Sequence, residues 1–255
     1  MTSPPRPVVL VTGAARRLGR AIALDFGRRG WSVALHVHAR DADAESLVRE
    51  IAALGARAEI FVADLSDQGA VESLIPTVAQ RLGAPISLIN NASLFVYDEI
   101  MTVTGAQWDH HFAINLKAPV FLAQALAKHL PAGASGNVIN ILDQRVWKPT
   151  PHFLSYSGTK AALWSMTQTL AQGLAPRIRV NAIGPGPMLR SVHQSEADFD
   201  AQCAATPLQR GTNPDEILAA IRFILDAPAM TGQMIALDGG QHLAWQTPDI
   251  GDGRG

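Results

Sequence analysis

The sequence predicts an α/β fold, a Rossmann-type doubly wound parallel sheet of about seven strands with helices on both faces. Short apolar runs alternate along the chain with longer segments that have one apolar helical face. The runs are continuously apolar, which is typical of strands that are buried on both faces of a parallel sheet. A glycine turn follows the first run, at the point where a strand passes into a helix. In such a fold the ligand crevice lies at the carboxyl ends of the strands.

The predicted strands are the apolar runs Val8–Val11, Val33–Val37, Ala58–Val62, Ile86–Ile89, Asn137–Leu142, Val180–Ile183 and Met234–Leu237. The predicted helices are Leu18–Arg29, Ala42–Leu54, Gln68–Leu82, Gly105–Leu130, Ser155–Leu174 and Pro214–Leu225. The chain has no internal repeat and no long linker, so we predict one domain over residues 1–255. We expect loose termini at 1–6 and 247–255 and a substrate loop at 187–206.

The composition is typical of a globular protein that binds neither nucleic acid nor a membrane. Of the 255 residues 47% are hydrophobic and 17% are charged, and the net charge is −1. Cys203 is the single cysteine, which excludes a disulfide within the chain and fits a reducing compartment. The apolar run after the polar first seven residues stops at Thr12, too soon for a signal peptide. We therefore expect a cytoplasmic location, and we expect no metal site.

The glycine turn Thr12–Gly19 predicts a dinucleotide site. Gly13 permits the tight turn, and Gly19 permits close approach of the backbone. Backbone N–H groups and the dipole of the following helix can then meet a pyrophosphate, with Arg16, Arg17 and Leu18 beside it. Alone, a pair of glycines is also compatible with an ordinary turn.

Cationic residues at the end of the second run favour NADPH over NADH. An NAD site usually has an acidic side chain there for the ribose 2′-hydroxyl. This chain has His38 and Arg40, and with Arg17 they can hold a 2′-phosphate. The alternative is that all three are solvated surface cations. Farther along, Asp64 and Leu65 follow the third run as candidates for the adenine, and Asn91 and Ala92 follow the fourth, where the cofactor ribose approaches.

Tyr156 and Lys160 are four residues apart, and therefore share one face of a predicted helix. A lysine ammonium beside a phenol favours the phenolate, so we expect Lys160 to lower the pKa of Tyr156 from about 10. Tyr156 is then a usable proton donor near neutral pH. Lys160 is also placed to bind the nicotinamide ribose.

These residues together resemble the short-chain dehydrogenase/reductase family. The resemblance runs from Val8 to Leu243 and includes the glycine turn, the Tyr–Lys pair, Pro185-Gly186 and the Asp238-Gly239-Gly240 ending. It implies that Asn115 helps to hold Lys160 through a water, and that Pro185 and Gly186 line the nicotinamide.

Asp143 departs from the general family pattern, which has a serine thirteen residues before the tyrosine. An ionised carboxylate repels an alkoxide developing from a ketone, but it suits a substrate with a basic nitrogen to be protonated. The chain is similar in this respect to the pteridine reductases and to bacterial dihydromonapterin reductases. That similarity implies that Phe95 stacks on a pterin ring and that Ser93 contacts both the cofactor phosphate and the substrate. Core packing is the alternative for Phe95, and a decayed site is the alternative for Asp143.

The sequence therefore predicts NADPH-dependent reduction of a 7,8-dihydropterin, with oxidised pterin or dihydrofolate as further candidates. The predicted catalytic residues are Asp143, Tyr156, Lys160 and Asn115, and the predicted substrate residues are Ser93, Phe95, Asp143, Tyr156 and Met188. One alternative is a general carbonyl or 3-oxoacyl thioester reductase of the same family. Another is a non-catalytic NADP(H)-sensing protein. The resemblance also implies a homotetramer, in which His242 or Trp245 either reaches a neighbour's site or packs at an interface.

Overall fold

The computed structural model describes residues 6–190 and 194–245. Their strands form one parallel sheet of seven strands in the order β3-β2-β1-β4-β5-β6-β7, which confirms the predicted fold class. The strands are β1 (Val8–Val11), β2 (Ser32–Val37), β3 (Ala58–Val62), β4 (Ser87–Asn90), β5 (Gly136–Ile141), β6 (Ile178–Pro185) and β7 (Met234–Leu237).

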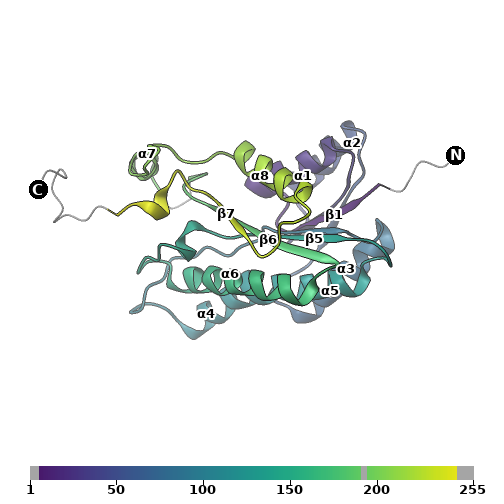
Figure 1. The fold of residues 1–255 in the computed structure, drawn as a ribbon, viewed down its shortest axis with the longest axis horizontal. Coiled ribbons are helices and arrows are strands. Elements are labelled where there is room, and N and C mark those ends of the chain that lie inside the picture. Colours follow the sequence, from purple (N-terminus) through teal and green to yellow (C-terminus); the bar gives the residue numbers. More distant parts are fainter. Residues whose placement is uncertain (1–5, 191–193, 246–255) are drawn as a thin grey trace, which may run out of the picture.

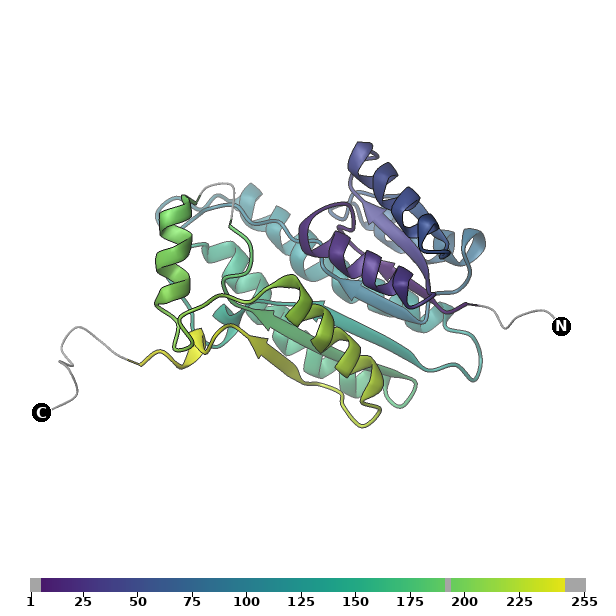
Figure 2. The same cartoon turned by 90° about the horizontal axis from the view of Figure 1, so that it is seen from above.

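Helices cover both faces of the sheet (Figures 1 and 2). They are α1 (Arg17–Arg28), α2 (Ala42–Ala53), α3 (Gln68–Arg81), α4 (Gly105–Phe112), α5 (Ala118–His129), α6 (Leu154–Leu174), α7 (Glu196–Ala204) and α8 (Pro214–Asp226). One apolar cluster joins the sheet to α1, α2 and α8, and a second joins it to α3 and α5. The first covers one face with residues such as Phe26, Leu47 and Ile221, and the second covers the other with residues such as Ile75 and Leu122.

The strand order reverses at β1, which pairs with β2 on one side and with β4 on the other. The connections from these neighbouring strands leave in opposite directions, so their loops diverge at the carboxyl ends. Thr12 bridges the two loops there, since its hydroxyl accepts from the backbone N–H groups of Asn91 and Ala92. The fold thus opens a crevice where the sequence predicts the cofactor.

Two segments differ from the sequence prediction. The predicted helix Gly105–Leu130 contains a π-helical turn at Ala113–Lys117 between α4 and α5. Periodicity does not detect one extra residue in a turn, because the apolar face continues on either side. The predicted substrate loop 187–206 contains α7, whose residues are intermediate or exposed and therefore carry no apolar stripe.

Part of the predicted loose termini and of the substrate loop lies outside the described residues, namely 1–5, 247–255 and 191–193. Within the described ranges, no helix combines the length and the apolar character needed to cross a membrane. Nor do His, Cys, Asp and Glu side chains of these ranges gather in a group of three that could hold a metal ion.

Candidate active site

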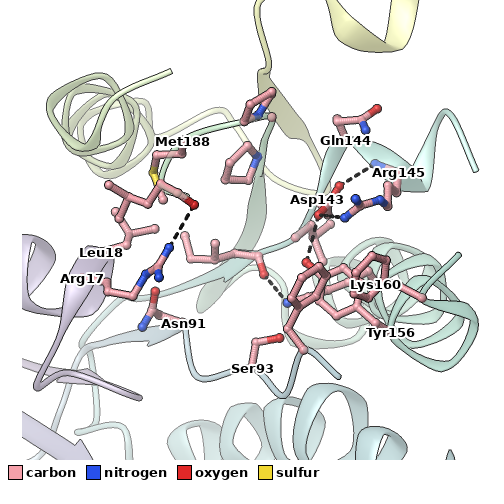
Figure 3. Close-up of a pocket in the computed structure, with 18 of the residues that line it drawn as sticks. Arg17, Leu18, Asn91, Ser93, Asp143, Gln144, Arg145, Tyr156, Lys160 and Met188 are labelled. Carbon is pink, nitrogen blue, oxygen red and sulfur yellow. Dashed lines mark hydrogen bonds and ion pairs between the residues drawn. The ribbon is translucent and has the colours of Figure 1, made fainter. Parts of the chain in front are cut away.

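A cavity of about 1150 Å³ opens at the carboxyl ends of the strands. It runs from the glycine turn between β1 and α1 to the start of α6, and the segment after β6 closes its other side (Figure 3). Of the residues predicted for the site, it is lined by Gly13, Arg16, Arg17, Leu18, Gly19, Asn91, Ala92, Ser93, Phe95, Asp143, Tyr156, Lys160, Pro185, Gly186 and Met188. His38, Arg40, Asp64, Leu65 and Asn115 are not among the lining residues.

Tyr156, Asp143 and Lys160 meet at the inner end of the cavity (Figure 3). The Tyr156 hydroxyl donates to Oδ2 of Asp143 at 2.9 Å. Lys160 Nζ donates to the carbonyl oxygen of Ile141 at 2.8 Å and lies 5.5 Å from the centre of the Tyr156 ring. α6 carries the tyrosine and the lysine, and Asp143 follows β5, so the two elements bring the three groups together.

The expectation that Lys160 lowers the pKa of Tyr156 is wrong for this arrangement. Burial raises the pKa of Tyr156 well above its usual value, the charge and hydrogen bond of Asp143 raise it further, and Arg145 partly opposes this. The ammonium of Lys160 is held by a carbonyl and not by the phenol. Burial lowers the pKa of Lys160 to about 8, with Asp143 opposing this shift.

Asn115 lies in the π-helical turn, a feature that is frequent at functional sites. Its amide oxygen accepts from the backbone N–H of Leu94 at 2.7 Å and from the Ser93 hydroxyl at 3.3 Å. Its amide nitrogen donates to the carbonyl of Leu94 and to the hydroxyl of Thr159 on α6. Asn115 therefore ties the loop after β4 to the helix that carries Tyr156, while a bridge from Asn115 to Lys160 stays a prediction.

Asp98 holds the start of α6 and was not singled out from the sequence. Its buried carboxylate accepts from the backbone N–H and the hydroxyl of Ser155, the residue before Tyr156. Phe153, one residue before the helix begins, has a left-handed backbone with φ +57°. The sharp entry and the buried carboxylate together fix the first turn, and with it the direction of Tyr156.

The glycine turn forms the cradle that a dinucleotide requires. Gly13 has φ +63°, and a Cβ at Gly19 would lie 2.1 Å from the carbonyl oxygen of Gly13. Side chains are thus excluded at both positions, and the backbone stays open to the cavity. Gly186 is equally constrained, since a Cβ there would lie 2.6 Å from Cα of Asp238. These cradles, and a cavity lined by both the glycine turn and Tyr156, fit a dinucleotide between them.

The side chain of His36 on β2 holds the glycine turn by a hydrogen bond. The backbone N–H of Gly13 donates to Nδ1 of His36 at 3.2 Å, and Nε2 lies 3.1 Å from the carbonyl oxygen of Ala63. Burial lowers the pKa of His36 to about 4, so the ring is neutral and accepts at Nδ1 while donating at Nε2. In the sequence, His36 stands out as a polar residue inside an otherwise apolar run, and this was the available signal for its role.

Arg16, beside the glycine turn, and Arg40, one of the predicted 2′-phosphate residues, are both paired with carboxylates. Arg16 forms ion pairs with Asp41 at 2.7 Å and with Asp43 at 2.5 Å. Arg40 pairs with Glu45 at 2.5 Å.

The other two predicted 2′-phosphate residues are Arg17 and His38. Arg17 has φ +50°, and its guanidinium donates to the carbonyl oxygens of Leu189 and Arg190 beyond β6. His38 is exposed at the end of β2.

The predicted adenine residues lie at the end of β3. The carboxylate of Asp64 accepts from the backbone N–H and the hydroxyl of Ser66, and the backbone hydrogen bond is the main cause that lowers the pKa of Asp64. Leu65 is buried in the core cluster under α3.

Aromatic rings and an arginine form the wall beside Asp143. Phe95 stacks on Phe153 with ring centres 4.3 Å apart, and it meets the Tyr156 ring edge to face at 4.7 Å. The Arg145 guanidinium lies 5.7 Å from the Phe95 ring and 5.4 Å from the Phe153 ring. The sequence had indicated Phe95; it had not indicated Phe153 and Arg145, because contacts across the cavity leave no periodic pattern.

The C-terminal candidates His242 and Trp245 follow Gln241, which lines the cavity. His242 Nδ1 is 2.7 Å from Oδ2 of Asp238, and its ring packs against Trp147. Trp245 is 70% exposed. Neither residue lines the cavity, although their neighbour Gln241 does.

Comparison with known proteins assigns the family. A model of the short chain dehydrogenase family matches residues 7–200. The chain is 34% identical over 244 residues to an uncharacterised oxidoreductase of Methylorubrum extorquens, with 91% of this chain and 96% of that protein covered. It is 30% identical to the 3-oxoacyl-[acyl-carrier-protein] reductase FabG of Staphylococcus epidermidis, with 92% and 98% covered.

A solved structure is more similar in sequence than either. The crystal structure of FolM alternative dihydrofolate reductase 1 from Brucella canis, complexed with NADP, shares 48% identity at a TM-score of 0.93, with 96% of this chain and 98% of that chain covered. The present chain therefore belongs to the short-chain dehydrogenase/reductase family, as its residues had indicated, and is an oxidoreductase of that family.

Proposed function

We propose that this protein reduces a 7,8-dihydropterin to the tetrahydropterin with NADPH. The hydrogen bond from Tyr156 to Asp143 carries the proposal, because it places a carboxylate where the family pattern has a serine. A carboxylate beside the proton donor opposes the alkoxide of a ketone substrate and favours a protonated ring nitrogen. The identity to a protein described as an alternative dihydrofolate reductase supports the same substrate class.

NADPH is the cofactor that the family and the site support. The Brucella canis relative is described in complex with NADP, and the predicted cofactor is confirmed at that level. In this chain we assign the pyrophosphate to the turn between Gly13 and Gly19, and the nicotinamide to the segment of Pro185 and Gly186. Arg17 and His38 remain the proposed 2′-phosphate residues, because Arg40 is already paired with Glu45.

The residues of the cavity have separate roles in the proposed reaction. Bound NADPH supplies the hydride to a ring carbon. Tyr156 holds the proton that goes to the adjacent nitrogen, and Asp143 orients the hydroxyl that carries it. The ammonium of Lys160 lies below the phenol ring, where its charge stabilises a phenolate left after proton donation. Phe95 supplies a flat face for the pterin.

A 3-oxoacyl thioester is the second candidate substrate, because a FabG protein is among the relatives at 30% identity. Oxidation of NADPH followed at 340 nm separates the two, with dihydrobiopterin, dihydrofolate and acetoacetyl thioester measured in parallel. We expect turnover of a dihydropterin and little of the thioester. Turnover of the thioester alone would refute the proposal. Tight NADPH binding without any turnover would instead favour a sensor of the cofactor.

A further inference from the structure

Arg145 donates hydrogen bonds to both oxygens of the Asp143 carboxylate. Asp143 precedes the short helix Gln144–Val146, and its Oδ1 accepts from the backbone N–H of Arg145 at 2.8 Å. Its Oδ2 accepts from Nη1 of Arg145 at 3.2 Å and from the Tyr156 hydroxyl at 2.9 Å. The carboxylate thus receives three donors, two of them from one residue (Figure 3).

The guanidinium is itself held in place. It packs against the rings of Phe95 and Phe153, and the side chain is only 20% exposed. The side chain of Asp143 is 17% exposed, so the ion pair is largely withdrawn from water. Screening is weaker there than at the surface, so the charge of Arg145 acts on the neighbouring Tyr156, whose pKa it lowers.

The charged and titratable groups near the Asp143 carboxylate come from the elements that form the cavity wall. The short helix after β5 contributes Arg145, and α6 contributes Tyr156 and the ammonium of Lys160, whose pKa Asp143 raises. Among the described residues, the loop after β4 contributes Ser93, Phe95 and Tyr97, and the hydroxyl of Tyr97 is hydrogen-bonded to His152, which precedes α6. The segment after β6 contributes the uncharged residues Pro185, Gly186 and Met188. Asp238 and His242, which are not lining residues, are paired with each other. Arg145 is therefore the cation in direct contact with the carboxylate.

We infer that Arg145 is a positioning residue, which holds the Asp143 carboxylate aimed at the hydroxyl of Tyr156. The inference rests on the proposed roles of Asp143 and Tyr156. Without the guanidinium, Oδ2 of Asp143 would keep the Tyr156 hydroxyl as its remaining donor, and the carboxylate would be held by the backbone N–H of residue 145 alone. The arginine also opposes the burial and the negative charge that raise the pKa of Tyr156, which eases release of its proton.

Arg145→Met tests the charge, because methionine can still pack on the two rings. We expect kcat for dihydropterin to fall about tenfold at neutral pH. The alkaline limb of its pH profile should move up, because the charge of Arg145 no longer lowers the pKa of Tyr156. The dissociation constant of NADPH should stay unchanged, which shows that the site is folded. Arg145→Lys keeps a cation and should restore the position of the alkaline limb.

A double-mutant cycle shows whether Arg145 acts through Asp143. In an Asp143→Asn background the carboxylate is absent, so adding Arg145→Met should change kcat by less than about twofold. An equal loss in both backgrounds would overturn the inference. It would also be overturned by a normal pH profile in Arg145→Met, or by an Arg145→Lys variant that behaves like Arg145→Met. If the parent reduces the thioester and no dihydropterin, the proposed function fails, and the same cycle on the thioester still tests Arg145.

Discussion

Asp143 is the residue that distinguishes this site from the serine pattern of its family, and its substitution tests the substrate class. In Asp143→Ser the phenol keeps a hydroxyl partner, but the negative charge is removed. We expect kcat/KM for dihydropterin to fall about 10²-fold or more, and reduction of a ketone or thioester to appear. Steady-state NADPH oxidation on both substrates measures this. Full pterin turnover in the variant would show that the carboxylate has no catalytic role.

Lys160 is a buried cation that costs stability. Its pKa is about 8 when folded and 10.5 when unfolded, so below pH 8 the folded state must hold a buried charge. Between pH 8 and 10.5 the unfolded chain binds the additional proton, and stability rises with pH.

Lys160→Met should therefore raise the free energy of unfolding by about 1–3 kcal/mol at pH 7, with the gain disappearing toward pH 10.5, while activity is lost. Denaturant unfolding at pH 7 and at pH 10 measures both limits. A variant destabilised at pH 7 would show that the hydrogen bond to Ile141 outweighs the buried charge.

At the scale of elements, His36 links β2 to the glycine turn. His36→Leu keeps an apolar volume but leaves the N–H of Gly13 without its acceptor, so we expect a loss of about 1–3 kcal/mol at pH 7. The pKa of His36 is about 4 when folded and 6.5 when unfolded. The unfolded chain binds the additional proton between these values, so the wild type loses stability as the pH falls from 6.5 to 4.

The difference between His36→Leu and the wild type should therefore shrink over that pH range. Urea unfolding at pH 7 and pH 4.5 measures it. A difference that stays constant would show that His36 does not titrate between the two states.

The glycine turn and the end of β2 together should set cofactor preference. Arg17 has a left-handed backbone that glycine adopts without strain, so Arg17→Gly is compatible with the turn. Combined with His38→Asp, it removes the two proposed 2′-phosphate cations and adds an acceptor for a 2′-hydroxyl. We expect the ratio of kcat/KM for NADPH to that for NADH to fall by about tenfold or more. An unchanged ratio would place the 2′-phosphate elsewhere, and Arg40→Ala is the matched control.

The strands and most helices could be predicted from the sequence because burial on both faces leaves continuous apolar runs. The glycine turn, Tyr156 and Lys160 were predictable because each has a local pattern. Arg145, Asp98 and Phe153 were not, since their partners are distant in the sequence or depend on one side chain's direction. The sign of the shift in the pKa of Tyr156 was missed for a related reason: spacing indicated Lys160 as the neighbour, while burial and Asp143 dominate.

For the whole molecule, the cavity joins segments from across the sheet: the turn after β1, the loop after β4, the start of α6 and the segment after β6. A ligand that contacts all of them stabilises the folded state as a unit. At about 100 times its dissociation constant, NADPH should add about 2.7 kcal/mol to the free energy of unfolding. Thermal unfolding with NADPH or NADH at equal concentration measures this, and a larger shift with NADH would contradict the proposed cofactor. The single domain, the homotetramer and the cytoplasmic location stay predictions.

The central claim concerns the position of Tyr156 in the loaded enzyme, and a crystal structure with NADP⁺ and a dihydropterin tests it most directly. We predict a pterin ring between Phe95 and the nicotinamide, with the Tyr156 hydroxyl within hydrogen-bond reach of both a ring nitrogen and Asp143. A pterin bound outside this cavity, or a Tyr156 hydroxyl turned away from the nicotinamide, would contradict the account.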